Sequence, residues 1–252
     1  MSSTEQKSTM KAAVYRLDQA GKAEQNRMSS VIGTSRLLGP AFLLQAIASL
    51  LAGVILNAVL IVPGNTVESM VSIANNAWLM KASILGDTVT AVGIVFLGAA
   101  LFVTLRERRQ TVSLVALGLY VLEAAMLAAS RLSAFALLNS SQAYVATGQP
   151  AYLQAMGSQA LDTMTFGYTL ALLPFGVGAV LFYYLLYECR TVPRALSLWG
   201  LLAVALTLPG TLLSIFGYGA SVLYYPYAPF EFVIGIWIAV KGAKRTQKPG
   251  GL

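Results

Sequence analysis

The chain has 252 residues, of which 57% are hydrophobic and 11% are charged. This composition leaves too little polar surface to cover a soluble domain of that size, so it excludes a soluble globular protein and predicts one that lies in a bilayer. The net charge of +7 would fit nucleic-acid binding, but the basic residues are grouped by side of the membrane, which excludes a nucleic-acid partner.

Six long apolar stretches follow one another along the chain, and each can cross about 30 Å of hydrocarbon as a helix. They cover residues 37–62, 77–105, 111–138, 163–187, 195–218 and 222–240. We therefore predict an all-α, polytopic membrane helical bundle with six transmembrane helices over residues 36–245. Residues 1–35 are predicted to form a mobile, basic cytoplasmic tail, and residues 246–252 a second cytoplasmic tail.

The basic residues predict the orientation of the bundle. Fifteen of the 17 Lys and Arg residues lie before the first span, after the last span, or between spans 2 and 3 and spans 4 and 5. The connections on the other side, residues 63–76, 139–162 and 219–221, contain none. Because cytoplasmic segments are rich in Lys and Arg, both termini are predicted to be cytoplasmic.

Two of the outer connections contain signals for helix initiation. "GNTVESMVSIANNAW" has Asn65 or Thr66 as a capping residue, and "GQPAYLQAMGSQALD" has Pro150 where a first helical turn accepts proline. We expect a short interfacial helix in each.

Arg131 lies in the third span, about 30 Å along the helix from Thr111 and so near the outer surface. An unpaired guanidinium at that depth is costly, and two carboxylates are expected at a similar height: Asp87 in span 2 and Asp162 at the outer end of span 4. We predict that Arg131 is neutralised by one or both of them. Thr165 shares the helix stripe of Asp162 and is placed in the same cleft.

Glu123 and Glu231 are expected near the midplane. Glu231 follows "YYPYAP", whose prolines predict an interrupted backbone and a short last helix that starts at Pro229. Irregular backbone at that depth requires a cavity or protein beside it, so Tyr224 and its neighbouring tyrosines are expected to form the wall above Glu231. Glu123 is expected to be protonated and to donate a hydrogen bond, with Tyr120 or Glu231 as an acceptor.

Three stretches of the sequence resemble a known family. They are "RLLGPAFLLQAIASLLAG" in span 1, "YYLLYECRTVPRALSLWGLLA" across spans 4 and 5, and "APFEFVIGIWIAVKG" in span 6. Over roughly residues 36–245 the chain is similar to an uncharacterised bacterial integral membrane family, domain of unknown function 4386. The resemblance implies several spans in the bacterial cytoplasmic (inner) membrane. It implies no activity and no catalytic residues, and the tail before Arg36 is longer than is usual in the family.

Two classes of function fit these observations. The chain has no His and one Cys, which argues against an enzyme with a His-based or thiolate site, and no cofactor or metal is expected. The leading hypothesis is a protein that binds or moves a small molecule, lipid or ion through an outward-facing polar cleft formed by Asp87, Glu123, Arg131, Asp162, Thr165, Tyr224 and Glu231. Its expected partners are membrane lipids and a small hydrophobic or amphiphilic ligand. The alternative is a non-catalytic structural or assembly subunit whose buried charges tie helices together; the ligand, protein partners and oligomeric state are left open.

Overall fold

The computed structural model describes Gln19 and residues 38–53 and 55–241. The predicted tails, 1–35 and 246–252, lie outside the described residues apart from Gln19. Every labelled element in the described part is helical. Six of its helices are long and apolar enough to cross a membrane, which confirms the predicted number of spans. The chain is a multi-span membrane protein.

The six spans agree closely with the apolar stretches of the sequence. The first covers Leu38–Leu60 and ends in the π-helix η1, Ile55–Leu60. The next four are α3 (Ala77–Leu105), α4 (Gln110–Ala146), α5 (Ala151–Cys189) and α6 (Arg194–Ile215). The last, Val222–Lys241, combines most of the 3-10 helix η2 (Ser221–Tyr224) with α7 (Tyr227–Lys241).

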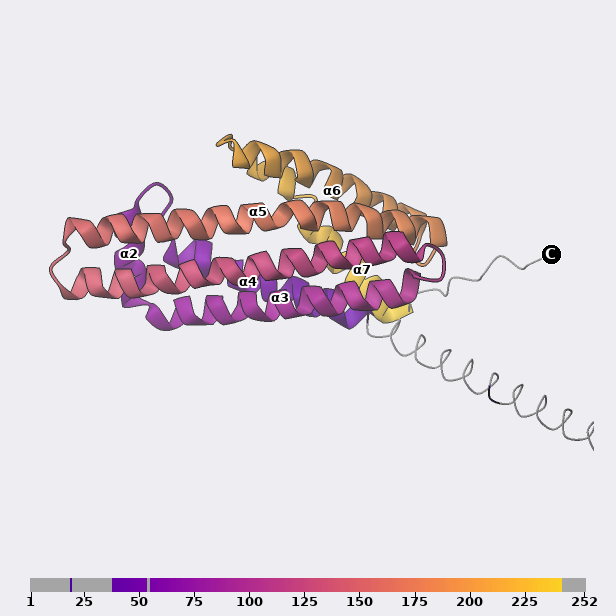
Figure 1. The fold of residues 1–252 in the computed structure, drawn as a ribbon, viewed down its shortest axis with the longest axis horizontal. Helices are drawn as coiled ribbons and strands as arrows, with labels where there is room; N and C mark the ends of the chain where they lie inside the picture. Colours follow the sequence, from indigo (N-terminus) through magenta and orange to yellow (C-terminus); the bar gives the residue numbers. More distant parts are fainter. Residues whose placement is uncertain (1–18, 20–37, 54, 242–252) are drawn as a thin grey trace, which may run out of the picture.

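The spans form a closed ring in which neighbours in sequence are neighbours in space. The helices α3, α4, α5, α6 and α7 each pack against the next, and α4 and α5 make a long antiparallel hairpin (Figure 1). Small residues close the ring through span 1. A Cβ atom on Gly93 of α3 would lie 3.3 Å from Cβ of Gln45, and one on Gly235 of α7 would lie 2.9 Å from Leu43. Span 1 therefore lies between α3 and α7, as expected for bundles in which small residues let helices approach closely.

One end of the ring, here called the basic end, carries the α3–α4 turn, the α5–α6 turn and the end of α7. Glu188, near the end of α5, links the two turns. Its carboxylate accepts hydrogen bonds of 3.0 and 3.3 Å from Arg109, and its Oε1 atom lies 3.4 Å from Arg108 Nε. The guanidinium of Arg194 lies 5.3 Å from the ring centre of Tyr187. The basic residues of this side that the structure describes thus lie together at one end: Arg106, Arg108, Arg109, Arg190, Arg194 and Lys241.

The opposite end extends farther than the sequence predicted. At about 1.5 Å per residue, α4 and α5 are each more than 50 Å long, well beyond the thickness of the hydrocarbon core. The helix α2, Thr66–Asn75, is capped by Asn65 as expected and packs on this extension. The predicted separate helix near Pro150 is wrong: that segment is the first part of α5. The chain reverses in a tight turn in which Gly148 and Gln149 have φ values of 78° and 62°.

This extension has its own small core, which explains why α4 and α5 continue past the membrane. Met70 and Ile73 of α2 are fully buried against Leu137 and Leu138 of α4 and against Met164 of α5. Burial of these apolar side chains stabilises the parts of α4 and α5 that extend beyond the apolar spans.

The last span is interrupted as its prolines predicted, but α7 begins at Tyr227, two residues before the predicted start at Pro229. The N–H groups of a helix's first turn have no intrahelical acceptor, so a proline there costs no hydrogen bond and the helix can begin before it. Tyr225 and Pro226 form the turn that separates η2 from α7.

Candidate functional site

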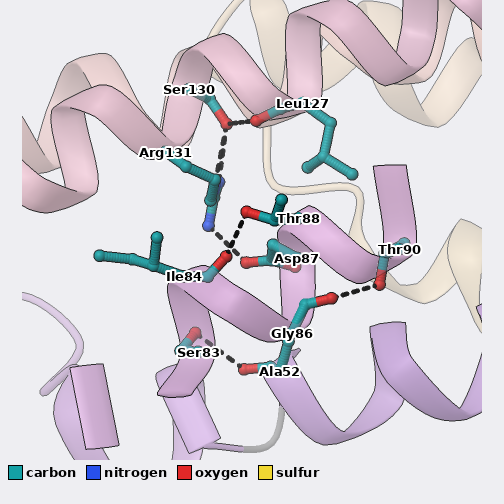
Figure 2. A network of polar contacts seen from close by, with 10 residues as sticks. All are labelled: Ala52, Ser83, Ile84, Gly86, Asp87, Thr88, Thr90, Leu127, Ser130 and Arg131. Carbon is teal, nitrogen blue, oxygen red and sulfur yellow. Dashed lines mark hydrogen bonds and ion pairs between the residues drawn. The ribbon is translucent and has the colours of Figure 1, made fainter. Parts of the chain in front are cut away.

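A buried ion pair joins α3 to α4. The Arg131 Nη1 atom donates a 2.8 Å hydrogen bond to Asp87 Oδ2, and the two side chains are 6% and 11% exposed (Figure 2). The other guanidinium nitrogens donate to Ser130 Oγ at 3.0 and 2.8 Å, and Ser130 donates to the Leu127 carbonyl. The predicted partnership of Arg131 with Asp87 is confirmed. Because the guanidinium is engaged on both sides, the pair ties two helices together and leaves little capacity to bind a ligand.

The polar stripe around Asp87 also serves the packing of α3. The Ser83 hydroxyl donates to the Ala52 carbonyl of span 1 at 3.3 Å, and Thr90 donates to the Gly86 carbonyl of its own helix at 3.0 Å (Figure 2). Span 1 and α4 are therefore held on two sides of the same turn of α3.

Asp162 and Thr165 lie away from the ion pair. Both are exposed on α5, and Asp162 makes no ion pair with Arg131 or with any other cation in the described part of the chain. They line a hollow of about 430 Å³ between α5 and residues 61–66, here called the outer hollow. The alternative in which Asp162 neutralises Arg131 is wrong, since Arg131 pairs with Asp87 and makes no ion pair with Asp162.

A second hollow, here called the central cavity, has a volume of about 450 Å³ and is lined by side chains from all six spans. Its polar lining residues on spans 1 to 4 are Gln45, Ser49, Thr90, Glu123, Tyr168 and Thr169. Those on the last two spans are Thr207, Ser214, Tyr224, Tyr225, Tyr227 and Glu231. Glu123, Tyr224 and Glu231, which the sequence placed in one cleft, therefore do line one cavity. Asp87 and Arg131 do not line it.

The floor of the central cavity lies near the middle of the bundle. Counting from the helix ends, the lining residues nearest the basic end, Ile94, Glu123, Phe175, Thr207 and Glu231, lie about 15–21 Å from that end. This agreement between five helices defines a single level, close to half the thickness of the hydrocarbon core.

Packed aromatic rings close the space between this floor and the basic end. Tyr120 meets Phe182 edge to face with ring centres 5.1 Å apart, and Tyr183 meets Phe230 in the same way at 5.0 Å. All four side chains are at most 2% exposed. At the other side of the cavity, the rim residue Tyr225 is 69% exposed. The cavity is thus closed toward the basic end, and its rim is exposed at Tyr225.

Tyrosine hydroxyls hold Glu231 in place. Tyr227 donates a 2.8 Å hydrogen bond to Glu231 Oε1, and its hydroxyl lies 3.0 Å from that of Tyr183. Because Tyr227 uses its proton on the carboxyl group, Tyr183 is the donor in the second bond. Nearer the rim, the Tyr224 hydroxyl lies 3.3 Å from Ser214 Oγ, which orients η2 against α6.

Two oxygen atoms that line the cavity have no hydrogen-bond partner. Glu123 and Gln45 are each 8% exposed, yet Glu123 Oε2 and Gln45 Oε1 make no hydrogen bond in the described structure. The predicted hydrogen bonds from Glu123 to Tyr120 or Glu231 are therefore not formed. A buried, unpaired carboxyl or amide oxygen is costly and is normally satisfied by water or by a bound molecule. Both groups line the space in which such a molecule would lie.

The central cavity and the outer hollow are adjacent. Thr169 of α5 and Ser214 of α6 line both of them. Asp162 and Thr165 thus lie on a polar route that leads from the surface at the opposite end toward Glu123 and Glu231. Among the described residues, no group of three or more His, Cys, Asp or Glu side chains could hold a metal ion.

A comparison with protein-family models gives one match, to a domain of unknown function, DUF4386, over residues 37–242. The chain belongs to this family. The match spans all six helices of the ring, so the central cavity lies entirely within the DUF4386 domain. No curated protein and no solved structure matches the chain significantly.

Sequence reasoning missed several lining residues of this DUF4386 domain. Gln45 is the clearest case, because an amide in an otherwise apolar span is itself a signal of an inward-facing position. Ser49, Tyr168, Thr207 and Ser214 carry weaker signals. Serine and threonine often bond to their own helix, as Thr207 does to the Ala203 carbonyl at 3.0 Å, so their presence alone does not indicate a cavity.

Proposed function

We propose that this protein binds a small molecule within the membrane, in the central cavity, which is reached from the outer side. The observation that carries the proposal is the cavity itself, to which all six spans contribute and which contains two carboxyl groups near mid-membrane depth. Its volume of about 450 Å³ is in the range of small-molecule sites, which are typically about 300–1,000 Å³. The proposal is for a binding role without catalysis.

The alternative role, a scaffold subunit, is supported by the Asp87–Arg131 pair, because this pair ties α3 to α4 and needs no ligand. The same reasoning does not extend to Glu123, whose Oε2 atom makes no bond to any helix. A carboxyl group that ties nothing together is better explained by a ligand or by ordered water than by a scaffold role.

We also propose that the basic end faces the cytoplasm of a bacterium and that the outer hollow faces the periplasm. Lys and Arg accumulate on the cytoplasmic side of bacterial membrane proteins. Both chain termini then lie in the cytoplasm.

Accessibility of the cavity to reagents in water tests the binding role. We expect a cysteine at position 207 (Thr207→Cys, in a Cys189→Ser background) to react with membrane-impermeant reagents in intact cells. The two reagents are trimethylammonioethyl methanethiosulfonate, which is cationic, and sulfonatoethyl methanethiosulfonate, which is anionic. Reaction with at least the cationic reagent is expected. Thr207 is only 2% exposed but lines the cavity. The matched control is Thr104→Cys. Native Thr104 is 7% exposed, lies near the basic end of α3 and does not line the cavity, so this cysteine should not react. If both cysteines are shielded from both reagents, the cavity is packed shut and the scaffold alternative is favoured.

The orientation is tested by cysteines in exposed turns at the two ends. We expect Thr147→Cys, in the α4–α5 turn, to react with an impermeant reagent in intact cells, and Glu107→Cys, in the α3–α4 turn, to react only after the cells are opened. Both native residues are exposed in the structure, so burial does not confuse the comparison. The reverse pattern of labelling would show that the basic end faces outward.

A further inference from the structure

We infer that the central cavity selects a ligand that carries an ammonium group on an apolar body. This inference rests on the proposed function and adds the chemical class of the ligand. It is carried by two features of the lining: carboxyl and amide oxygens that lack partners, and tyrosine rings that surround them.

The charges of the lining favour a cation. Glu123 and Glu231 face the same buried space, and no Lys or Arg from the described residues lines it. Two carboxylates in one desolvated site repel each other, and the repulsion is relieved when the site takes up a proton or a cation. The nearest buried guanidinium, that of Arg131, is already paired with Asp87 and does not line the cavity.

The unpaired oxygens give the acceptors that an ammonium group needs. Glu123 Oε2 and Gln45 Oε1 come from α4 and span 1, and each belongs to a residue that is 92% buried. An ammonium N–H group donates hydrogen bonds and accepts none, so it is complementary to carboxyl and amide oxygens. A quaternary ammonium group has no N–H and is attracted to the same carboxyl groups by its charge alone. Glu231 is held by Tyr227 and supplies a third acceptor of fixed orientation.

Aromatic rings favour an organic cation over a metal ion. The rings of Tyr168, Phe175, Tyr224, Tyr225 and Tyr227 line the cavity. The faces of such rings attract quaternary and primary ammonium groups, whereas small metal ions require several oxygen ligands at about 2.0–2.6 Å. Ile94, Leu127 and Leu172 supply an apolar wall for the rest of the molecule.

The test uses benzyltrimethylammonium and neopentylbenzene, its neutral isostere, which has carbon in place of the charged nitrogen. Purified Thr207→Cys protein in the Cys189→Ser background is labelled with the neutral reagent methyl methanethiosulfonate. If benzyltrimethylammonium binds with a Kd of about 1 mM, then about 10 mM of it should slow labelling about tenfold, because protection follows 1 + [L]/Kd. Neopentylbenzene at the same concentration should leave the rate unchanged.

Variants of the lining identify the source of the protection. Glu123→Gln keeps the shape of the side chain but cannot ionise when a cation arrives, so protection should fall below about twofold while Thr207→Cys still reacts. Tyr168→Phe should keep the protection and Tyr168→Leu should weaken it, because only the former keeps an aromatic face. A fold defect would change the rate of labelling without ligand, which separates it from a loss of binding.

The outcomes distinguish this inference from the proposed function. Labelling of Thr207→Cys without protection by benzyltrimethylammonium, or with equal protection by neopentylbenzene or by sodium chloride, would overturn the ammonium class and leave an accessible binding cavity. Slower labelling in phosphatidylethanolamine than in phosphatidylglycerol nanodiscs would identify a lipid amine as the source of the ammonium group. Equal rates in both lipids, together with protection by benzyltrimethylammonium, would identify a free amine.

Discussion

Replacing Arg131 with leucine is expected to lower the free energy of unfolding by about 3 kcal/mol, the size of effect seen when one member of a buried ion pair is removed. The substitution leaves the Asp87 carboxylate 11% exposed with no counterion, and it also removes both donors to Ser130. Unfolding of the purified protein in mild detergent, followed by circular dichroism, measures the change.

A double-mutant cycle provides the control for this prediction. Asp87→Leu combined with Arg131→Leu should recover part of the loss, because the pair is then removed as a unit. Asp162→Asn should change stability little and should add to Arg131→Leu without coupling, since Asp162 is exposed and makes no bond to Arg131. Strict additivity of the Asp87 and Arg131 substitutions would contradict the ion pair.

The second large effect is expected from Gly39→Ala, which should greatly reduce the yield of folded protein. A Cβ atom at Gly39 would meet the backbone nitrogen of Ala239 and would lie 2.7 Å from its Cα atom. Backbone atoms cannot rotate out of the way, so span 1 and α7 would have to separate where they close the ring. The yield of monodisperse protein and its melting temperature measure the effect.

Gly118→Ala is the matched control, because a Cβ atom there meets nothing within 4 Å and the residue lies on an exposed face of α4. Alanine in place of glycine in a helix should stabilise the protein slightly, by up to about 1 kcal/mol. If Gly39→Ala is tolerated as well as Gly118→Ala, then span 1 and α7 do not pack as described.

The sequence predicted well the features that depend on position along a helix. Apolar length located the spans, and the rise per residue placed Asp87 and Arg131 at matching depths, so their pairing followed from electrostatic cost. The interruption before Glu231 followed from Pro226 and Pro229. These inferences needed only one helix at a time and the thickness of the bilayer.

Features that depend on which helix faces which could not be predicted in the same way. The closure of the ring at Gly39 and the inward position of Gln45 depend on the packing of span 1 between α3 and α7. The extension of α4 and α5 depends on a small core that these helices share with α2, and the apolar length of each helix taken alone does not indicate it. For the same reason, depth alone suggested that Asp162 could pair with Arg131, although the two side chains are not in contact.

A high-resolution density map of the protein in lipid nanodiscs would test the central claim, a solvated binding cavity in the middle of the six-helix ring, most directly. We predict density for water or for a bound molecule within hydrogen-bonding distance of Glu123 Oε2 and Gln45 Oε1, inside a hollow that continues past Thr169 and Ser214 toward the end opposite the basic end. A map in which the six helices pack without such a hollow, with Glu123 bonded directly to a neighbouring helix, would contradict the claim.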